Sequence, residues 1–255
     1  MKNTRLPSDY SVIELRRYVT TPGGRERFAR YFETYFPEAF QQLGAFAFGH
    51  FFERTQANRF TWLRGYKDMD ARAVINGAFY YGPVWKEHKA TLNSLLVDND
   101  DVLLLRPLNP DCRIPALRAV DLLAEPAGAQ GIVVCQIFKI APGAFDELVQ
   151  AAEQRFQTYQ GKGVVEAGIL TTLHQANNFP QHPIRNDGNY LVWLGVLRDE
   201  AALAALRPAL DASARTLEAS ALLAGPTELV LLDPAARSRL RWIPVPEMAA
   251  VECAA

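Results

Sequence analysis

Residues 13–18, IELRRY, followed by Pro22-Gly23, decide the fold, because the pattern returns as residues 133–138, VVCQIF, followed by Pro142-Gly143. Each apolar, β-branched run predicts a strand, and each Pro-Gly pair breaks it ahead of an amphipathic helix. Residues 58–63, NRFTWL, likewise return as 189–194, NYLVWL, and the strand at 102–107 returns at 229–234. The chain therefore contains an internal repeat of about 125 residues.

Both halves predict the order strand, helix, strand, strand, helix, strand. The first half predicts strands at 11–19, 45–54, 59–66 and 102–105, a helix that Pro37 divides, and helical sequence at 68–96 broken at Gly82-Pro83. The second half predicts strands at 131–140, 164–174, 189–197 and 228–232, with helices ending near 160 and 223. Each half is thus a ferredoxin-like βαββαβ unit.

A four-stranded sheet with helices on one face leaves its other face uncovered, and soluble proteins avoid so large an apolar patch. Two copies in one chain can pack their bare faces together. The predicted fold class is therefore α+β, with tandem ferredoxin-like repeats forming a barrel, a pseudo-dimer within one chain. We expect a first domain at 1–108, a linker at 109–130, a second domain at 131–242 and a tail at 243–255.

The composition describes a soluble globular protein. Of 255 residues, 49% are hydrophobic, which suffices for a core, and 27 basic residues against 28 acidic ones leave no excess for binding nucleic acid. No apolar run is long enough to span a membrane. The first seven residues do not resemble a secretory signal, and Cys112, Cys135 and Cys253 suit neither a disulfide framework nor a metal site. We therefore expect a cytoplasmic protein.

Four motifs in the first half resemble those of the NIPSNAP family: ELRRY at 14–18, NRFTWLRG at 58–65, FYYGPVWKEH at 79–88 and VLLLRP at 102–107. The resemblance is dense over residues 12–107 and weaker over 131–242. It implies the dimeric α/β-barrel fold, in agreement with the repeat. It implies little chemistry, since wider relatives include cofactor-free monooxygenases, haem-dependent enzymes, isomerases and simple binders.

Strand alternation divides the side chains between two faces, and apolar or small residues at alternate positions are assigned to the helices. The remaining side chains are expected inside the barrel: Glu14, Arg16, Tyr18, Phe46, Phe48, His50, Phe52, Phe60, Trp62, Arg64 and Tyr66 in the first half, and Val134, Gln136, Phe138, Leu191, Trp193 and Leu197 in the second. The polar members lie mostly in the first half, which predicts one pocket lined by aromatic rings.

We assign catalytic roles in this pocket to His50, Arg64 and Glu14. Paired guanidinium groups hold a carboxylate, enolate or phenolate, and a histidine exchanges a proton near neutral pH. Substrate contacts are assigned to Arg16, Tyr18, Phe48, Trp62, Tyr66, Tyr80, Trp85, His88 and Trp193. The structural alternative is that Glu14 pairs with Arg16 or Arg64 in a buried network, and that His50 and His88 pack in the core.

Two functions follow. The first is an enzyme that acts on a small aromatic or anionic molecule by cofactor-independent oxygenation or proton abstraction; the second is a non-catalytic ligand-binding or protein-interaction module. Motifs for nucleotide, metal and haem sites are missing, so no cofactor or metal is expected. The expected partner is a small-molecule ligand, with no nucleic acid or membrane; chains could also associate through their outer surfaces. The polar loop at 175–188 is either a lid or a solvated connection.

Overall fold

The computed structural model describes residues 9–243, so the expected tail, apart from Ile243, and Cys253 lie outside the described residues. The first half contains β1 (Val12–Thr20), α1 (Arg25–Tyr35), α2 (Pro37–Gln42), β2 (Phe46–Glu53), β3 (Arg59–Tyr66), α3 (Met69–Tyr80), α4 (Pro83–Asn93) and β4 (Leu96–Pro107). Pro37 and Pro83 each stand in the first turn of a helix, where proline's missing N–H costs nothing. These prolines divide the helical sequence as predicted.

The second half begins after the short 3₁₀ helix η1 (Pro110–Cys112). It contains β5 (Ile132–Ile140), α5 (Phe145–Gln157), β6 (Val164–Thr172), β7 (Asn189–Leu197), α6 (Glu200–Glu218) and β8 (Glu228–Pro234). The element order of the first half therefore recurs, and the α+β fold class with repeated βαββαβ units is confirmed.

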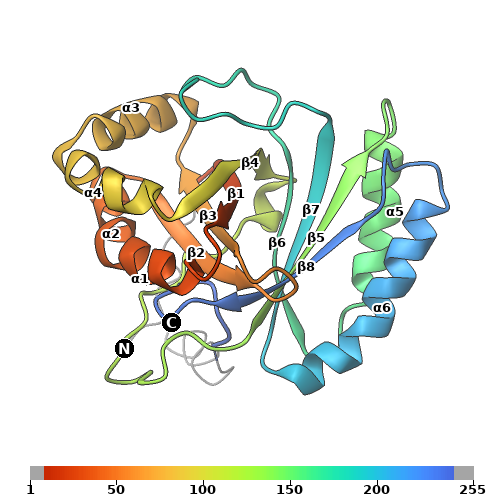
Figure 1. Cartoon of the computed structure of the whole chain (residues 1–255). Coiled ribbons are helices and arrows are strands. Elements are labelled where there is room, and N and C mark those ends of the chain that lie inside the picture. Colours follow the sequence, from red (N-terminus) through yellow and green to blue (C-terminus); the bar gives the residue numbers. More distant parts are fainter. Residues whose placement is uncertain (1–8, 244–255) are drawn as a thin grey trace, which may run out of the picture.

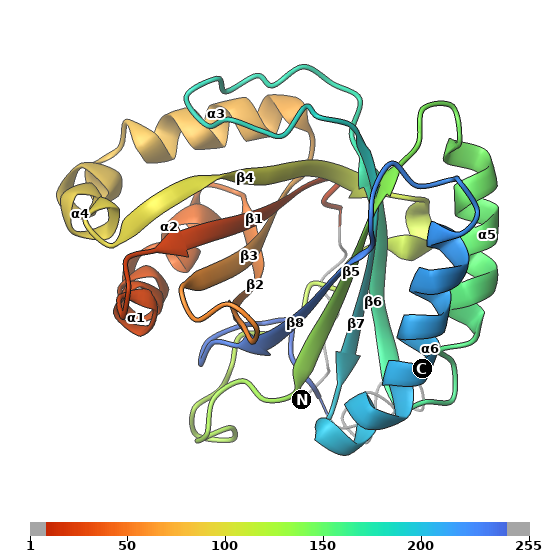
Figure 2. The same cartoon turned by 45° about the vertical axis from the view of Figure 1, so that its right-hand side comes forward.

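The eight strands form one closed barrel within a single chain, in the order β1-β3-β2-β8-β5-β7-β6-β4. Two antiparallel seams join the halves: β2 pairs with β8 through Phe51 and Pro234, and β4 pairs with β6 through Leu105 and Thr172. Helices α1–α4 cover the first half of the barrel, and α5 and α6 cover the second on the opposite side (Figures 1 and 2). Closure removes the exposed sheet edges that would otherwise pair with other chains.

The barrel interior is filled with apolar side chains from both halves. Ile13 and Leu15 of β1 belong to the same buried cluster as Val133 and Cys135 of β5. Packing there is close: a Cβ atom on Gly65 would lie 2.4 Å from the ring of Phe48. The predicted linker contributes too, because Ile114 and Ala116 are buried in this cluster.

The predicted assignment of strand faces is wrong for most positions. The charged and aromatic residues expected inside the barrel lie instead between each sheet and its helices, while Ile13, Leu15 and Leu63 fill the interior. Phe46 and Phe48 do lie inside, because a bulge between Ala47 and Gly49 reverses the alternation within β2. The residues that lie on the helix side instead are Glu14, Arg16, Tyr18, His50, Phe52, Phe60, Trp62, Arg64, Tyr66, Val134, Gln136, Phe138, Leu191, Trp193 and Leu197.

Among residues 9–243, none of the helices combines the length and the apolar composition that a membrane span requires.

Candidate functional site

A carboxylate surrounded by three guanidinium groups lies between the first sheet and its helices. Glu14 of β1 pairs with Arg16 of the same strand at 2.9 Å, with Arg64 of β3 at 2.5 Å and with Arg72 of α3 at 2.7 Å. All four side chains are fully buried. Residues 14 and 16 share a face of β1, and Arg64 lies directly opposite Glu14 in the antiparallel register, so the sheet brings these groups together.

The electrostatics of this cluster keep its members ionised. Burial alone would raise the pKa of Glu14, but Arg64, Arg16 and Arg72 outweigh that effect and hold the pKa well below its usual range. Burial opposes the charge on Arg64 as well, and Glu14 nevertheless raises the pKa of Arg64 well above its usual value. The cluster therefore carries three positive charges and one negative charge.

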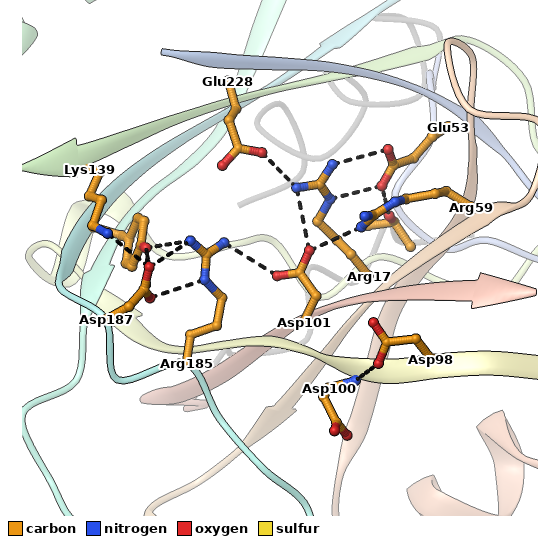
Figure 3. Close-up of polar contacts among 12 residues, drawn as sticks. Arg17, Glu53, Arg59, Asp98, Asp100, Asp101, Lys139, Arg185, Asp187 and Glu228 are labelled. Carbon is orange, nitrogen blue, oxygen red and sulfur yellow. Dashed lines mark hydrogen bonds and ion pairs between the residues drawn. The ribbon is translucent and has the colours of Figure 1, made fainter. Parts of the chain in front are cut away.

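A second charged network, at one mouth of the barrel, provides a comparison (Figure 3). Arg17 pairs there with Glu53 and Glu228, and Arg185 pairs with Asp101 and Asp187. With Arg59 and Lys139, which pair with Asp101 and Asp187, cations and carboxylates are equal in number. The cluster around Glu14 is different: among the described residues no other carboxylate pairs with its arginines, so two positive charges are in excess.

A cavity of about 210 Å³ lies beside this cluster. Tyr18 and Trp62 form part of its wall, and the guanidinium carbon of Arg16 lies 5.4 Å and 5.8 Å from the centres of their rings. Asn93 and Asn99 contribute polar groups at α4 and β4. The remaining wall is mainly aromatic: Phe32, Phe36, Phe40, Phe79, Tyr80 and Trp85.

Four buried N–H donors of this region have no hydrogen-bond partner among residues 9–243. They are Nη2 of Arg16, Nη2 of Arg72, Nε1 of Trp62 and Nδ2 of Asn76. Buried donors are almost always paired in folded proteins, because an unpaired one costs about 1–3 kcal/mol. Trp62 lines the cavity and Arg16 packs against its ring, so these two unpaired donors indicate a site for a hydrogen-bond acceptor on that side of the cavity.

The repeat provides an internal control for this inference. Trp193 occupies the position of Trp62 in the second half, and its Nε1 donates to Glu166 at 2.8 Å. Gln136 replaces Arg16 there, and its Oε1 accepts a hydrogen bond from the Tyr159 hydroxyl at 2.7 Å. The groups that correspond to Arg16 and Trp62 are thus satisfied within the second half, and the excess of buried positive charge is particular to the cluster around Glu14.

The loop between β6 and β7, residues 173–188, crosses from the second half to α3 of the first (Figures 1 and 2). Arg72 fixes it there, because Nη1 donates to Oδ1 of Asn177 at 3.0 Å and to Oδ1 of Asn178 at 2.8 Å. His182 of this loop joins the cavity wall, with its ring centre 3.9 Å from that of Tyr80. Burial, and then the charges of Arg16 and Arg64, lower the pKa of His182 to about 3.

The structure brings together some of the predicted site residues and separates others. Glu14, Arg16 and Arg64 form the charged cluster, while Tyr18, Trp62, Tyr80 and Trp85 line the cavity. Tyr66 is buried nearby, and its hydroxyl donates to Asn76 at 2.8 Å.

The other predicted site residues lie elsewhere. His50 faces α1, with its Nδ1 3.0 Å from a carboxylate oxygen of Glu33. His88 on α4 pairs with the Tyr31 hydroxyl and stacks on Tyr35. Phe48 fills the barrel interior. Trp193, on β7, packs between the second sheet and helices α5 and α6.

Sequence reasoning missed Arg72 and His182 as members of this site. Arg72 lies on a predicted helix, where an arginine ordinarily faces solvent, and no local signal marks it as buried. The composition of the loop around His182 allows either a lid or a solvated connection, and its contact with the first half depends on barrel closure. Groups of three histidine, cysteine or acidic side chains able to hold a metal do not occur in the described part of the chain.

Comparison with known proteins finds a family similarity in the first half. Residues 13–110 match the NIPSNAP family model, and no curated protein is a detectable match to the sequence. A candidate monooxygenase from Fusobacterium nucleatum subsp. nucleatum shares the fold with a TM-score of 0.59 at 10% identity, over 92% of this chain and 96% of that one. An anthrone oxidase-like protein aligns with a TM-score of 0.57 at 13% identity, over 93% and 98% of the two chains.

An uncharacterized NIPSNAP-like domain protein from Burkholderia xenovorans is 28% identical over 43% of this chain and 96% of its own, with a TM-score of 0.37.

Proposed function

We propose that this chain, which carries a NIPSNAP domain over residues 13–110, binds a small anionic aromatic molecule in the cavity between its first sheet and helices α1–α4, and acts on it as an enzyme. The observation that carries the proposal is the excess of two buried positive charges beside an aromatic cavity. The predicted ligand class is retained, but its location moves from the barrel interior to the space beneath the helices.

A buried charge without a partner of opposite charge destabilises the folded state. Each ion costs several kcal/mol to desolvate, and a partner of opposite charge is needed to offset that cost. A bound anion would be that partner for Arg16, whose Nη2 atom is unpaired and whose guanidinium lies against the Trp62 ring of the cavity wall, and Trp62 would add a neutral donor. Guanidinium groups bind carboxylate and phenolate oxygens with strong charge-assisted hydrogen bonds.

The size and wall of the cavity favour a single substituted aromatic ring. A cavity of about 150 Å³ lined by apolar side chains holds benzene, and this one, at about 210 Å³, leaves room for ring substituents. The rings of Phe36, Phe40 and Phe79 offer faces and edges against which a ligand ring can pack. We therefore propose a phenol or an aromatic enol, bound as its anion.

The chemistry proposed for this site is stabilisation of the substrate anion. An environment with two excess positive charges lowers the pKa of a bound phenol or enol, and the anion is the electron-rich form that oxygenation without a cofactor requires. The similarity of fold to a candidate monooxygenase and an anthrone oxidase-like protein supports this reaction class by analogy only.

Titration with 4-nitrophenol tests the binding step, because its anion is coloured. We expect the purified protein to lower the pKa of the bound phenol, and Arg16→Gln to weaken binding about 10- to 100-fold, which corresponds to the loss of one charged hydrogen bond. Arg207→Gln on α6, where Arg207 is exposed and pairs with Asp211, is the matched control and should bind as the parent does. Unchanged affinity in Arg16→Gln would refute the site.

An oxygen electrode then tests catalysis. If the protein is an enzyme, we expect it to consume oxygen with members of a panel of phenols and aromatic enols. Arg16→Gln should lose this activity, and Arg207→Gln should keep it. Binding of the phenolate without turnover across the panel would instead favour the ligand-binding module.

A further inference from the structure

We propose that His182, which the second half of the chain contributes to the cavity of the first, accepts the proton that a phenolic ligand loses when it binds as an anion. This inference rests on the function proposed above and deepens it by naming the proton acceptor. The O–H bond of the ligand breaks and its electron pair stays on the oxygen. The proton forms an N–H bond with the free lone pair of the imidazole, so no oxidant or reductant is needed.

The position of His182 supports this role. Its ring is part of the cavity wall, lies tilted against Tyr80 with 3.9 Å between ring centres, and stacks on Phe179 at 5.3 Å. Its backbone is fixed as well: Nδ2 of Asn177 donates to the His182 carbonyl at 2.9 Å, and Asn177 in turn accepts from Arg72. No other histidine among the described residues lines this cavity.

The charged groups around His182 come from three elements of the first half. β1 contributes Arg16 and Glu14, β3 contributes Arg64, and α3 contributes Arg72. Two further titratable side chains, Tyr18 of β1 and Tyr80 of α3, line the same cavity. Asn93 and Asn99, from α4 and β4, face the same cavity and carry no charge. The net field at the imidazole is therefore positive, and burial adds to its effect.

This field gives the imidazole a ligand-dependent affinity for protons. Without an anion, burial and the arginines keep His182 neutral at physiological pH, with its lone pair free to accept a proton. A bound phenolate offsets the arginine charges, so the pKa of His182 rises. Anion binding and proton binding at His182 are thus mutually favourable, as thermodynamic linkage requires.

Counting protons by calorimetry tests the proposal. Binding of 4-nitrophenol to the full chain is measured at a pH below the pKa of the free phenol, in two buffers that differ in ionisation enthalpy. The parent should bind the phenolate and release almost no proton, because His182 retains it, whereas His182→Gln should release about one proton per ligand to the buffer. His174→Gln, an exposed histidine of the same loop, is the matched control and should behave as the parent does.

A second measurement, by NMR, follows His182 in the parent protein without any substitution. The imidazole resonances of His182 in the unmodified protein should move to the position of a protonated ring when the ligand is added. Equal proton release in the parent and in His182→Gln, or an unmoved His182 resonance, would overturn the proposal while leaving the anion site intact. Failure of the parent to bind the phenolate at all would instead overturn the proposed function and this inference with it.

Discussion

Replacing Glu14 with glutamine should destabilise the protein strongly, because this carboxylate holds three buried cations. Arg16, Arg64 and Arg72 all contact it at 2.5–2.9 Å, and all four side chains are fully buried. The amide of Glu14→Gln occupies the same volume but removes the negative charge, so the cluster would contain three uncompensated positive charges.

The expected loss of stability in Glu14→Gln is large because the ion pairs that it breaks are fully buried. Removing one partner of a buried ion pair costs about 3–5 kcal/mol, and domains of ordinary stability unfold at a cost of only about 5–15 kcal/mol. At about 2–4 °C of melting temperature per kcal/mol for a chain of this size, the expected loss is about 6–20 °C. Urea unfolding monitored by tryptophan fluorescence measures the free energy directly.

The contribution of Glu14 to the free energy of unfolding should decrease as the pH falls. Because the folded-state pKa of Glu14 lies below its unfolded value, its contribution is fully present above the unfolded pKa of about 4.3 and is lost as the pH falls through the folded pKa. Acidification below about pH 4 should therefore destabilise the parent through this group, and Glu14→Gln should lack that part of the acid dependence.

The control is Glu26→Gln on α1, where an exposed carboxylate pairs with Arg25. Its unfolding free energy should change by less than about 0.5 kcal/mol. An unfolding free energy for Glu14→Gln within about 1 kcal/mol of the parent would refute the reasoning, because the arginines would then not depend on this carboxylate.

Four further substitutions test the placement of the cavity and of the loop that closes it. Phe48→Ala should cost about 3–5 kcal/mol in urea unfolding, because its ring fills the barrel interior, yet leave the affinity for 4-nitrophenol unchanged; weaker binding would contradict this placement. Trp193→Phe should lose about 1 kcal/mol more than Trp62→Phe, since only Trp193 donates a hydrogen bond, whereas in titrations only Trp62→Phe should weaken binding. Arg72→Gln should release the 173–188 loop and speed tryptic cleavage after Arg185, and an unchanged cleavage rate would show that Asn177 and Asn178 do not fix the loop.

Most of the fold could be predicted from local signals. Pro37 and Gly82-Pro83 fix where helices divide, since proline removes a donor and restricts the residue before it. The repeat predicts the barrel, because a duplicated sheet can cover its own bare face. β4 is longer than expected, Leu96–Pro107 rather than 102–105, because an acidic run that looks like a loop pairs with β1.

The candidate site could be predicted only in part. Alternation grouped Glu14, Arg16 and Tyr18 on one face of β1, and the structure keeps them together. The same alternation could not say which face meets the helices, because both faces of these strands are buried and a period of two has two equivalent phases. The bulge beside Phe48 shows how one extra residue exchanges the faces within a strand.

By itself, the sequence determined the order of elements, their duplication and the set of charged and aromatic side chains that share a strand face, because these depend on spacing along the chain. Only the tertiary structure decided that the charged set lies under the helices, that Arg72 completes it and that His182 arrives from the other half. These are contacts between distant segments, and they exist only once the barrel has closed.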